Sequence, residues 1–299
     1  MNLEKNVTNK NLNKYQTVKV PPLTIEKIVT QALTEDIGPR DITAQLIHKN
    51  HKGFAQVITR QNMVLCGADW VTQVFKKINP TITIRWFFGD GDIIKKNKIL
   101  FEIKGCTKDI LSGERVALNF LQMLSAVATK TQHYVNKIAH TKAKIIDTRK
   151  TIPGFRIAQK YAVHCGGGTN HRIGLFDGIL IKENHIAASD YSIIKAVNKA
   201  RKIHHDKKIE VEVETYHQLQ DALIAKADII MLDNFKLSQI KKAVCLINKK
   251  AIIEVSGNYI LDNIIDIAET EIDFISSGDL TKNIEAIDLS MRFTSESFR

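Results

Sequence analysis

The chain has 299 residues, which is enough for one large domain or two moderate ones. Its 43 basic and 32 acidic side chains give a formal net charge of +11, so nucleic acid, a membrane surface or small acidic molecules are the candidate partners. The bases are mostly scattered lysines, without a run of five and without interleaved aromatic residues, which argues against nucleic-acid binding. No uninterrupted apolar span reaches the about 18 residues of a membrane helix, so no membrane association is expected.

The cysteines and the first residues predict a cytoplasmic protein. Cys66, Cys106, Cys165 and Cys245 lie far apart and form no Cys-x-x-Cys motif. This spacing argues against a disulfide framework or a thiolate metal site and suits a reducing compartment. Residues 1–16 are polar, contain no apolar signal-peptide core and are predicted to be a disordered lead-in.

The first part of the chain mixes helical and strand patterns. The expected elements are a helix over 23–36, a strand pair over 54–67, a helix over 68–79, and strands over 81–88 and 98–105. This order predicts an α+β domain built on an antiparallel sheet. A strongly helical segment over 109–127 follows and is expected to bridge to a second domain.

Beyond this helix, short apolar strands alternate with helices. The six expected strand segments, each with its polar end, are 143–150, 178–185, 209–215, 228–235, 251–258 and 272–279. This alternation predicts a parallel sheet, with a closed or nearly closed barrel favoured over a doubly wound open sheet. In a barrel the active site lies at the carboxyl ends of the strands, where all six segments carry polar residues.

The segment 147–185 is rich in cations. Its bases are Arg149, Lys150, Arg156, Lys160, Arg172 and Lys182, and its acids are Asp147, Asp177 and Glu183, which leaves a net charge of +3. Guanidinium forks bind carboxylate or phosphate in a bidentate manner, so an anion pocket is predicted. Ion pairing at the surface is the alternative.

Acidic residues follow in the next two units. Glu210, Glu212 and Glu214 alternate along one strand, and Asp233 ends the next. One acid from each of two strand ends suits Mg²⁺, which usually keeps waters and substrate phosphates as further ligands. A solvated strand face is the alternative for the three glutamates.

Small residues end the last two strands and also lie within the cation-rich segment. Ser256-Gly257 and Ser277-Gly278 suit phosphate binding by backbone N–H groups. The triplet Gly166–Gly168 is interpreted chiefly as a tight bend leading to the next residues. His164 and His185 are interpreted as structural and Cys165 as a buried thiol, so no nucleophile–base pair is evident.

This inventory favours a reaction that depends on positioning and electrostatics. The predicted reaction moves a phosphorylated sugar from a diphosphate leaving group to an anionic acceptor.

Five segments carry a family resemblance. "LSGERVALNFLQ", "DTRKTIPGFR", "YAVHCGGGTNHRIGLFDGILIKENH", "EVEVET" and "MLDNF" resemble the quinolinate phosphoribosyltransferases, also called nicotinate-nucleotide pyrophosphorylases (carboxylating), within a match over residues 24–290. The resemblance implies a transferase of NAD biosynthesis that uses Mg²⁺. It would join quinolinate to 5-phosphoribosyl 1-diphosphate and release diphosphate and CO₂ to give nicotinate mononucleotide.

The resemblance also implies an architecture. The fold would be an N-terminal α/β open sandwich plus an incomplete parallel α/β barrel, in a homodimer. The sandwich would comprise residues 17–125 and the barrel 126–285, with the tail 286–299 returning to the sandwich.

Family roles can be assigned by residue. Arg149, His171 and Arg172, with Lys150 beside them, would grip the two carboxylates of quinolinate, and Thr148 would also contact substrate. Lys150 and Lys182 would contact the sugar diphosphate, and Glu212 and Asp233 the ribose and Mg²⁺, directly or through water. These four are the expected catalytic residues. The 5-phosphate site would comprise Ser256, Gly257, Ser276, Ser277 and Gly278.

Two further positions extend these expectations. Arg115 would reach the active site of the partner subunit. Lys282 stands where the family usually has a histidine, and altered phosphate affinity is expected there rather than loss of function. A transferase that accepts nicotinate in place of quinolinate is the alternative within this fold, and a basic nucleic-acid-binding protein is the alternative outside it.

Overall fold

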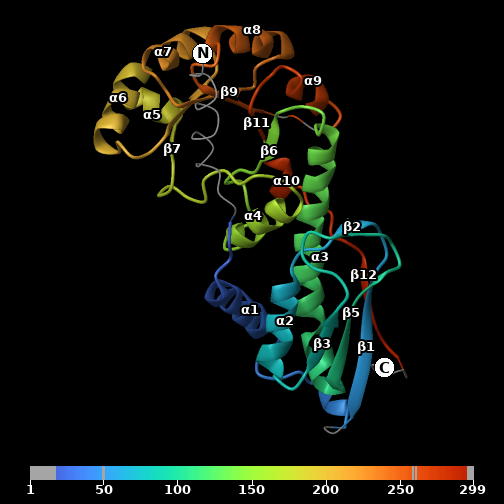
Figure 1. Cartoon of the computed structure of the whole chain (residues 1–299). Coiled ribbons are helices and arrows are strands. Elements are labelled where there is room, and N and C mark those ends of the chain that lie inside the picture. Colours follow the sequence, from blue (N-terminus) through green and yellow to red (C-terminus); the bar gives the residue numbers. More distant parts are fainter. Residues whose placement is uncertain (1–17, 49–50, 258, 260, 295–299) are drawn as a thin grey trace, which may run out of the picture. The chain divides into compact units, whose positions relative to one another are not determined.

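The computed structural model describes residues 18–48, 51–257, 259 and 261–294 (Figure 1), so the predicted lead-in over 1–16 lies outside the described residues. The described chain divides into two compact units. We call residues 18–132, 153–167 and 283–294 the antiparallel unit, and residues 133–152 and 168–282 the parallel unit. Each is described by itself.

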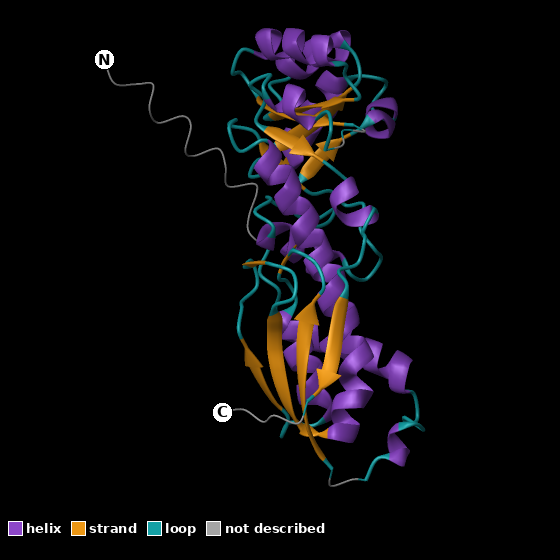
Figure 2. Ribbon diagram, turned by 90° about the vertical axis from the view of Figure 1, so that its right-hand side faces the viewer, coloured by secondary structure: helices purple, strands orange, loops and turns teal. Residues whose placement is uncertain are grey.

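The antiparallel unit is built on a four-stranded sheet. Its strands, in spatial order, are β12 (Leu289–Phe293), β1 (Lys52–Thr59), β5 (Ile99–Cys106) and β3 (Thr83–Trp86), and each neighbouring pair is antiparallel. Its helical segments are α1 (Pro22–Ile37), η1 (Ala44–Leu46), α2 (Ala68–Ile78), most of α3 (Thr107–Lys137) and α4 (Arg156–Cys165). Helices of this unit lie on one face of the sheet (Figure 2). The expected α+β domain is therefore confirmed.

Helix α2 shows why this face is covered. Its buried residues Trp70, Val71, Val74 and Phe75 recur at helical spacing and form one apolar stripe. Burying such a stripe against a sheet is what stabilises a two-layer domain.

One expected pairing in this unit is wrong. Residues 54–67 were expected to form a strand pair, but β1 pairs with β5 and β12, whereas β2 (Met63–Val64) pairs with β4 (Ile93–Ile94). Both edges of β1 are already occupied, so β2 has no edge of β1 to join.

Helix α3 is longer than its expected end at residue 127. Ala128, Thr131 and Tyr134 continue its buried face at a spacing of three residues. Gly166, just beyond α4, lies so close to α3 that an added Cβ would be 2.2 Å from the carbonyl oxygen of Ala128. The next residue, Gly167, has a φ of 85°. The glycines therefore permit close packing and a sharp bend, and the bend was predicted from the sequence.

The parallel unit contains one six-stranded sheet. In spatial order the strands are β6 (Lys144–Ile146), β11 (Phe274–Ser276), β10 (Ile252–Ser256), β9 (Ile229–Asp233), β8 (Ile209–Val213) and β7 (Ile179–Ile181), and all neighbours are parallel. All six expected strands are thus present. Within the described residues β6 and β7 do not pair with each other, so the sheet does not close and the incomplete barrel is confirmed.

Helices cover this sheet. They are α5 (Glu183–Ala187), α6 (Ile193–Ile203), α7 (Tyr216–Ile224), α8 (Leu237–Ile247), α9 (Ile264–Ala268) and α10 (Asp279–Lys282). Helices α6, α7 and α8 follow one another along the same side of the sheet (Figure 1). All five residues of β8 and the first four of β9 are buried, as expected for parallel strands covered on both faces.

The helices in the described part of the chain include none that is both long and apolar enough to cross a membrane.

Candidate active site

The register of the parallel sheet aligns the carboxyl ends of its strands. Ser276 at the end of β11 pairs with Ser256 at the end of β10, and Ser256 pairs with Asp233 at the end of β9. At the far side of the sheet Ile181 pairs with Val211, so Lys182 and Glu212 follow at one level. Predicted site residues from five strands therefore lie along one edge.

Two arginines provide the guanidinium groups of this edge. Arg149 and Arg172 each have a buried Nε with no hydrogen-bond partner among the described residues. Arg172 donates through Nη1 to the carbonyl oxygen of Gly178 at 2.9 Å. Burial lowers the pKa of Arg172 and the neighbouring charge of Arg149 lowers it further, although Glu210 and Asp177 oppose the shift. Two neighbouring guanidinium groups, each with a buried N–H donor that lacks a partner, fit a ligand that carries more than one anionic group.

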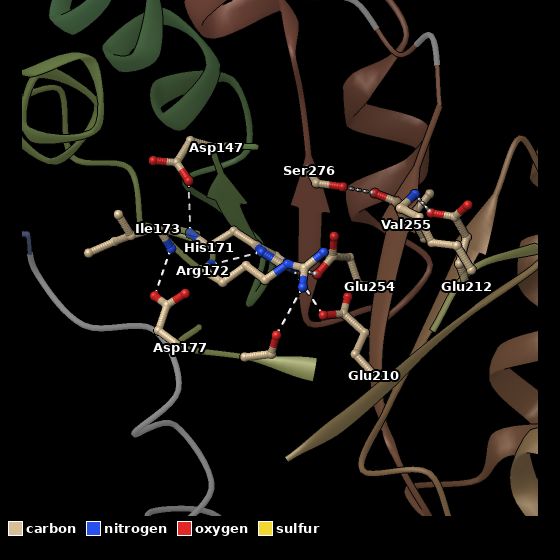
Figure 3. Close-up of polar contacts among 12 residues, drawn as sticks. Asp147, His171, Arg172, Ile173, Asp177, Glu210, Glu212, Glu254, Val255 and Ser276 are labelled. Atoms are coloured by element: carbon tan, nitrogen blue, oxygen red, sulfur yellow. Dashed lines mark hydrogen bonds and ion pairs between the residues drawn. The ribbon is translucent and has the colours of Figure 1, made fainter. Parts of the chain in front are cut away.

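The loop that carries Arg172 is held by two carboxylates. The fully buried Asp147 accepts hydrogen bonds from the backbone N–H of His171 at 2.8 Å and from Nδ2 of Asn170 at 2.7 Å. Asp177 accepts from the backbone N–H of Ile173 at 2.7 Å (Figure 3). The loop is therefore pinned on both sides of Arg172, which limits where the guanidinium can lie.

His171 contacts protein groups through both ring nitrogens. Its Nε2 lies 3.0 Å from Oε2 of Glu210 and 3.7 Å from Oε2 of Glu254, and its Nδ1 accepts the backbone N–H of Arg172 at 2.8 Å. Figure 3 shows the His171 ring converging with both carboxylates, which come from β8 and β10. Its expected role as a direct ligand of substrate stays a prediction.

The two predicted metal ligands lie on neighbouring strands. Glu212 on β8 contacts the ammonium of Lys182, and Asp233 ends β9. Burial raises the pKa of Glu212, with a further contribution from the charge of Asp233, whereas Lys182 opposes the rise. Asp233 therefore lies near enough for its charge to act on Glu212. Carboxylate oxygens are the ligands that Mg²⁺ prefers, so these residues fit a Mg²⁺ that keeps water or phosphate as its other ligands.

The ends of β6 and β11 meet at a glycine. A Cβ added at Gly278 would lie 2.9 Å from Cδ of Lys150 and 3.6 Å from Oγ1 of Thr148. The hydroxyl of Thr281 donates to the carbonyl oxygen of Lys150 at 2.7 Å. The backbone N–H of Ser277 donates to the carbonyl oxygen of Ile146 at 3.1 Å. A side chain at position 278 would therefore displace the side chain of Lys150.

The structure brings most of the predicted site residues into one unit. The residues of the parallel unit that lie at or just beyond the carboxyl ends of its strands are Thr148, Arg149, Lys150, Lys182, Glu212, Asp233, Ser256, Gly257, Ser276, Ser277 and Gly278. His171 and Arg172 belong to the same unit and lie in the loop before β7. Arg115 lies in the antiparallel unit, exposed on α3. Lys282 is exposed at the end of α10.

His164, His185 and Cys165 were predicted to have no catalytic role. His185 accepts the backbone N–H of Lys182 at 3.1 Å and so caps α5, which confirms its structural role. His164 is exposed. Cys165 is half-buried rather than buried, and its sulfur lies within 4.8 Å of ligand atoms of Cys66 and Asp90.

Sequence reasoning missed the carboxylates behind the site. Asp147 was counted only as a charge, Glu210 only as part of an alternating strand, and Glu254 not at all. One signal pointed to Glu254: a single acid inside the apolar run "AIIEVS" of a strand buried on both faces. An acid there is costly unless it has a partner.

This fold and this edge define an α/β enzyme that binds anionic substrates at the carboxyl ends of a parallel sheet. Sequence models of the quinolinate phosphoribosyl transferase N-terminal domain match residues 41–125, and those of the C-terminal domain match residues 127–292. The chain therefore belongs to the quinolinate phosphoribosyl transferase family, as its motifs indicated.

Relatives and solved structures agree with this assignment. The chain is 38% identical over 273 residues to a probable nicotinate-nucleotide pyrophosphorylase [carboxylating] of Bacillus subtilis, which covers 91% of this chain and 94% of the relative. A similarly named protein of Methanocaldococcus jannaschii is 38% identical over 276 residues, covering 89% and 95%. The structure of the nicotinate-nucleotide pyrophosphorylase from Francisella tularensis matches with a TM-score of 0.89 and 49% identity, covering 93% of this chain and 99% of that one.

Proposed function

We propose that this chain transfers the phosphoribosyl group of 5-phosphoribosyl 1-diphosphate to quinolinate, releasing diphosphate and CO₂ and forming nicotinate mononucleotide for NAD biosynthesis. Membership of the family supports this reaction. The observation that carries it to the site is the pair Arg149 and Arg172, each with a buried Nε that has no hydrogen-bond partner in the described chain. Quinolinate has two adjacent carboxylates, which match two guanidinium groups.

Each substrate has a proposed set of ligands. Quinolinate would lie against Arg149, His171, Arg172 and the Thr148-to-Lys150 strand end. The diphosphate of the sugar would face Lys150 and Lys182, and the ribose would face Glu212 and Asp233. The 5-phosphate would bind the backbone at Ser256-Gly257 and at Ser276-Ser277-Gly278. The alignment of these strand ends in one row supports this arrangement.

The first chemical step exchanges two bonds at C1 of the ribose. The ring nitrogen of quinolinate attacks C1 while the bond from C1 to the diphosphate oxygen breaks, and the diphosphate leaves with that electron pair. Lys150 and Lys182 stabilise the charge that develops on the leaving group. Arg149 and Arg172 hold the ring so that its nitrogen faces C1, which removes the entropic cost of orientation.

Loss of CO₂ follows from the new charge. The ring nitrogen is now a pyridinium, so the bond to the adjacent carboxylate breaks, CO₂ leaves, and the electron pair stays on the ring carbon beside the positive nitrogen. That carbon then takes a proton from solvent.

A divalent cation belongs to the proposal. Glu212 and Asp233 would hold Mg²⁺, directly or through water, and the bound ion would offset the charge of the diphosphate. Both carboxylates lie on the same strand ends as the proposed ribose site.

The proposal includes a homodimer in which Arg115 enters the partner subunit's active site. Exposure of this side chain on α3 supports it. Mixing inactive Arg115→Ala and Arg172→Ala variants tests it, because a mixed dimer has one intact site if Arg115 acts across the interface. Activity that does not reappear on mixing would refute the shared site. A cytoplasmic location is proposed as well, on the wide spacing of the four cysteines and their lack of a Cys-x-x-Cys motif.

Paired acceptor assays test the reaction. Quinolinate and nicotinate are supplied in parallel with the sugar diphosphate, with Mg²⁺ or with EDTA, and both diphosphate and CO₂ are measured. We expect turnover with quinolinate, one CO₂ per diphosphate, and loss of turnover in EDTA that Mg²⁺ restores. Turnover with nicotinate but not with quinolinate would overturn the proposed function, and full activity in EDTA would overturn the metal.

A further inference from the structure

Beside Arg172, the His171 ring turns one nitrogen toward two buried carboxylates. Its Nε2 is 3.0 Å from Oε2 of Glu210 and 3.7 Å from Oε2 of Glu254. Glu210 and Glu254 are fully buried, and His171 is 6% exposed. Two carboxylates removed from water are costly to keep, so their placement calls for an explanation in terms of what they hold.

The hydrogen bonds of the ring determine its tautomer. Nδ1 accepts the backbone N–H of Arg172 at 2.8 Å, and a ring nitrogen that accepts carries no hydrogen. The ring hydrogen is therefore on Nε2, which donates to Glu210. In this arrangement one side of the ring is tied to β8 and the other to the backbone of Arg172.

The position of Arg172 depends on this chain of contacts. The backbone N–H of Arg172 donates to the His171 ring, and the backbone N–H of His171 donates to Asp147 at 2.8 Å. The Nη1 atom of Arg172 donates to the carbonyl oxygen of Gly178 at 2.9 Å. If the ring turned, the backbone N–H of Arg172 would lose its buried acceptor. The backbone position from which the guanidinium extends would then no longer be fixed. A shift of about 1 Å in a positioning group can cost on the order of a hundredfold in rate.

We propose that Glu210 and Glu254 are positioning residues. They hold the His171 ring with its hydrogen on Nε2, and the ring, through Nδ1, positions Arg172 to bind quinolinate. The proposal rests on the proposed function and adds to it two residues that do not touch substrate. Glu210 is the direct acceptor, and Glu254 lies 3.7 Å from the same ring nitrogen. In this role His171 acts through Arg172.

The charge of the cluster agrees with this division of roles. Burial, and then the neighbouring Glu210 carboxylate, raise the pKa of Glu254 to about 8. Near neutral pH Glu254 therefore holds its proton and adds no negative charge to the buried pair. Two adjacent anions in this position would repel each other.

Two variants at Glu210 separate the hydrogen bond from the packing. Glu210→Gln keeps the size and a carbonyl acceptor, whereas Glu210→Met keeps a similar size and removes the acceptor. We expect the methionine variant to raise KM for quinolinate by about 10- to 100-fold, the range for a lost hydrogen bond to a charged group, while the glutamine variant stays within about threefold of wild type. KM for the sugar diphosphate is expected to change little in both, because neither His171 nor Arg172 is among its proposed ligands.

The matched control is Glu271→Met, the same substitution at an exposed residue outside the proposed site. An equal rise of both KM values, or a folded methionine variant with unchanged KM for quinolinate, would overturn the positioning role. A glutamine variant as impaired as the methionine variant would also overturn it, because the loss would then come from charge or packing rather than from the hydrogen bond.

The tautomer gives a readout that needs no activity. Long-range ¹H–¹⁵N spectra of the full chain labelled at histidine, with His171→Gln to assign the signal, should show the His171 hydrogen on Nε2 in wild type and a changed signal in Glu210→Met. A hydrogen on Nδ1, or a metal on Nε2, would overturn the inference. A chain inactive with quinolinate that nevertheless shows the Nε2 hydrogen would refute the proposed function alone.

Discussion

Replacing Glu254 with glutamine tests the buried carboxyl pair through the free energy of unfolding. The folded chain raises the pKa of Glu254 from 4.5 to about 8, by burial and by the charge of Glu210. Between these values the folded chain holds a proton that the unfolded chain has released. Because the folded state binds more protons, the stability that this group contributes is full at low pH and is lost as pH rises through the window.

The magnitude follows from the width of the window. Each pH unit inside it changes the free energy of unfolding by about 1.4 kcal/mol, so this one group lowers the stability of wild type by about 3 kcal/mol between pH 5 and pH 7. Glutamine has nearly the same shape as the protonated acid and does not titrate. Relative to wild type, Glu254→Gln is therefore expected to gain about 3 kcal/mol over that interval.

Urea unfolding followed by circular dichroism at several pH values measures this difference. Glu271→Gln is the control, because it removes an exposed carboxyl group of the same chemistry. Parallel stability curves for wild type and Glu254→Gln would refute the reasoning, since they would mean that Glu254 keeps no extra proton in the fold. A control that behaves like Glu254→Gln would place the effect in net charge.

Three further predictions concern separate parts of the chain. Arg172→Ala is expected to lower kcat/KM for quinolinate by the equivalent of about 2–4 kcal/mol, the scale for removing a preorganised charged donor, and a near-wild-type value would contradict its role. Gly166→Ala places a Cβ 2.2 Å from the carbonyl oxygen of Ala128, so thermal unfolding should reveal a loss of about 1–3 kcal/mol; an unchanged midpoint would show that the backbone can yield. Burial raises the pKa of the Cys66 thiol, so mass spectrometry should find it alkylated at least about tenfold more slowly than the exposed Cys245, and equal rates would argue against that burial.

Much of the fold was predictable because its signals are local. The six strands of the parallel sheet are short apolar runs with polar ends, and that pattern survives without knowledge of any partner. The errors arose where the answer was not local. Whether β2 joins β1 depends on whether the edges of β1 are occupied, and β12, which takes one of them, lies more than 200 residues away in the sequence.

The candidate site divides in the same way. Arg149, Lys182 and Asp233 were recognisable because parallel strands bring their carboxyl ends to one edge, so a polar residue after an apolar run predicts its own location. Arg172 precedes β7 and was recognisable from the cation-rich segment 147–185. Glu254 gave only a weak signal, because an acid inside an apolar strand says that it has a partner but not which one.

By itself the sequence determined which residues carry charge at the edge of the parallel sheet, since strand pattern and residue type are local properties. Only the tertiary structure decided what those residues contact. His171 meets a carboxylate 39 residues away on β8 and another on β10, and its two nitrogens are thereby directed at protein groups. Such partners follow from strand order and register, which are set by the packing of the whole unit rather than by any segment of it.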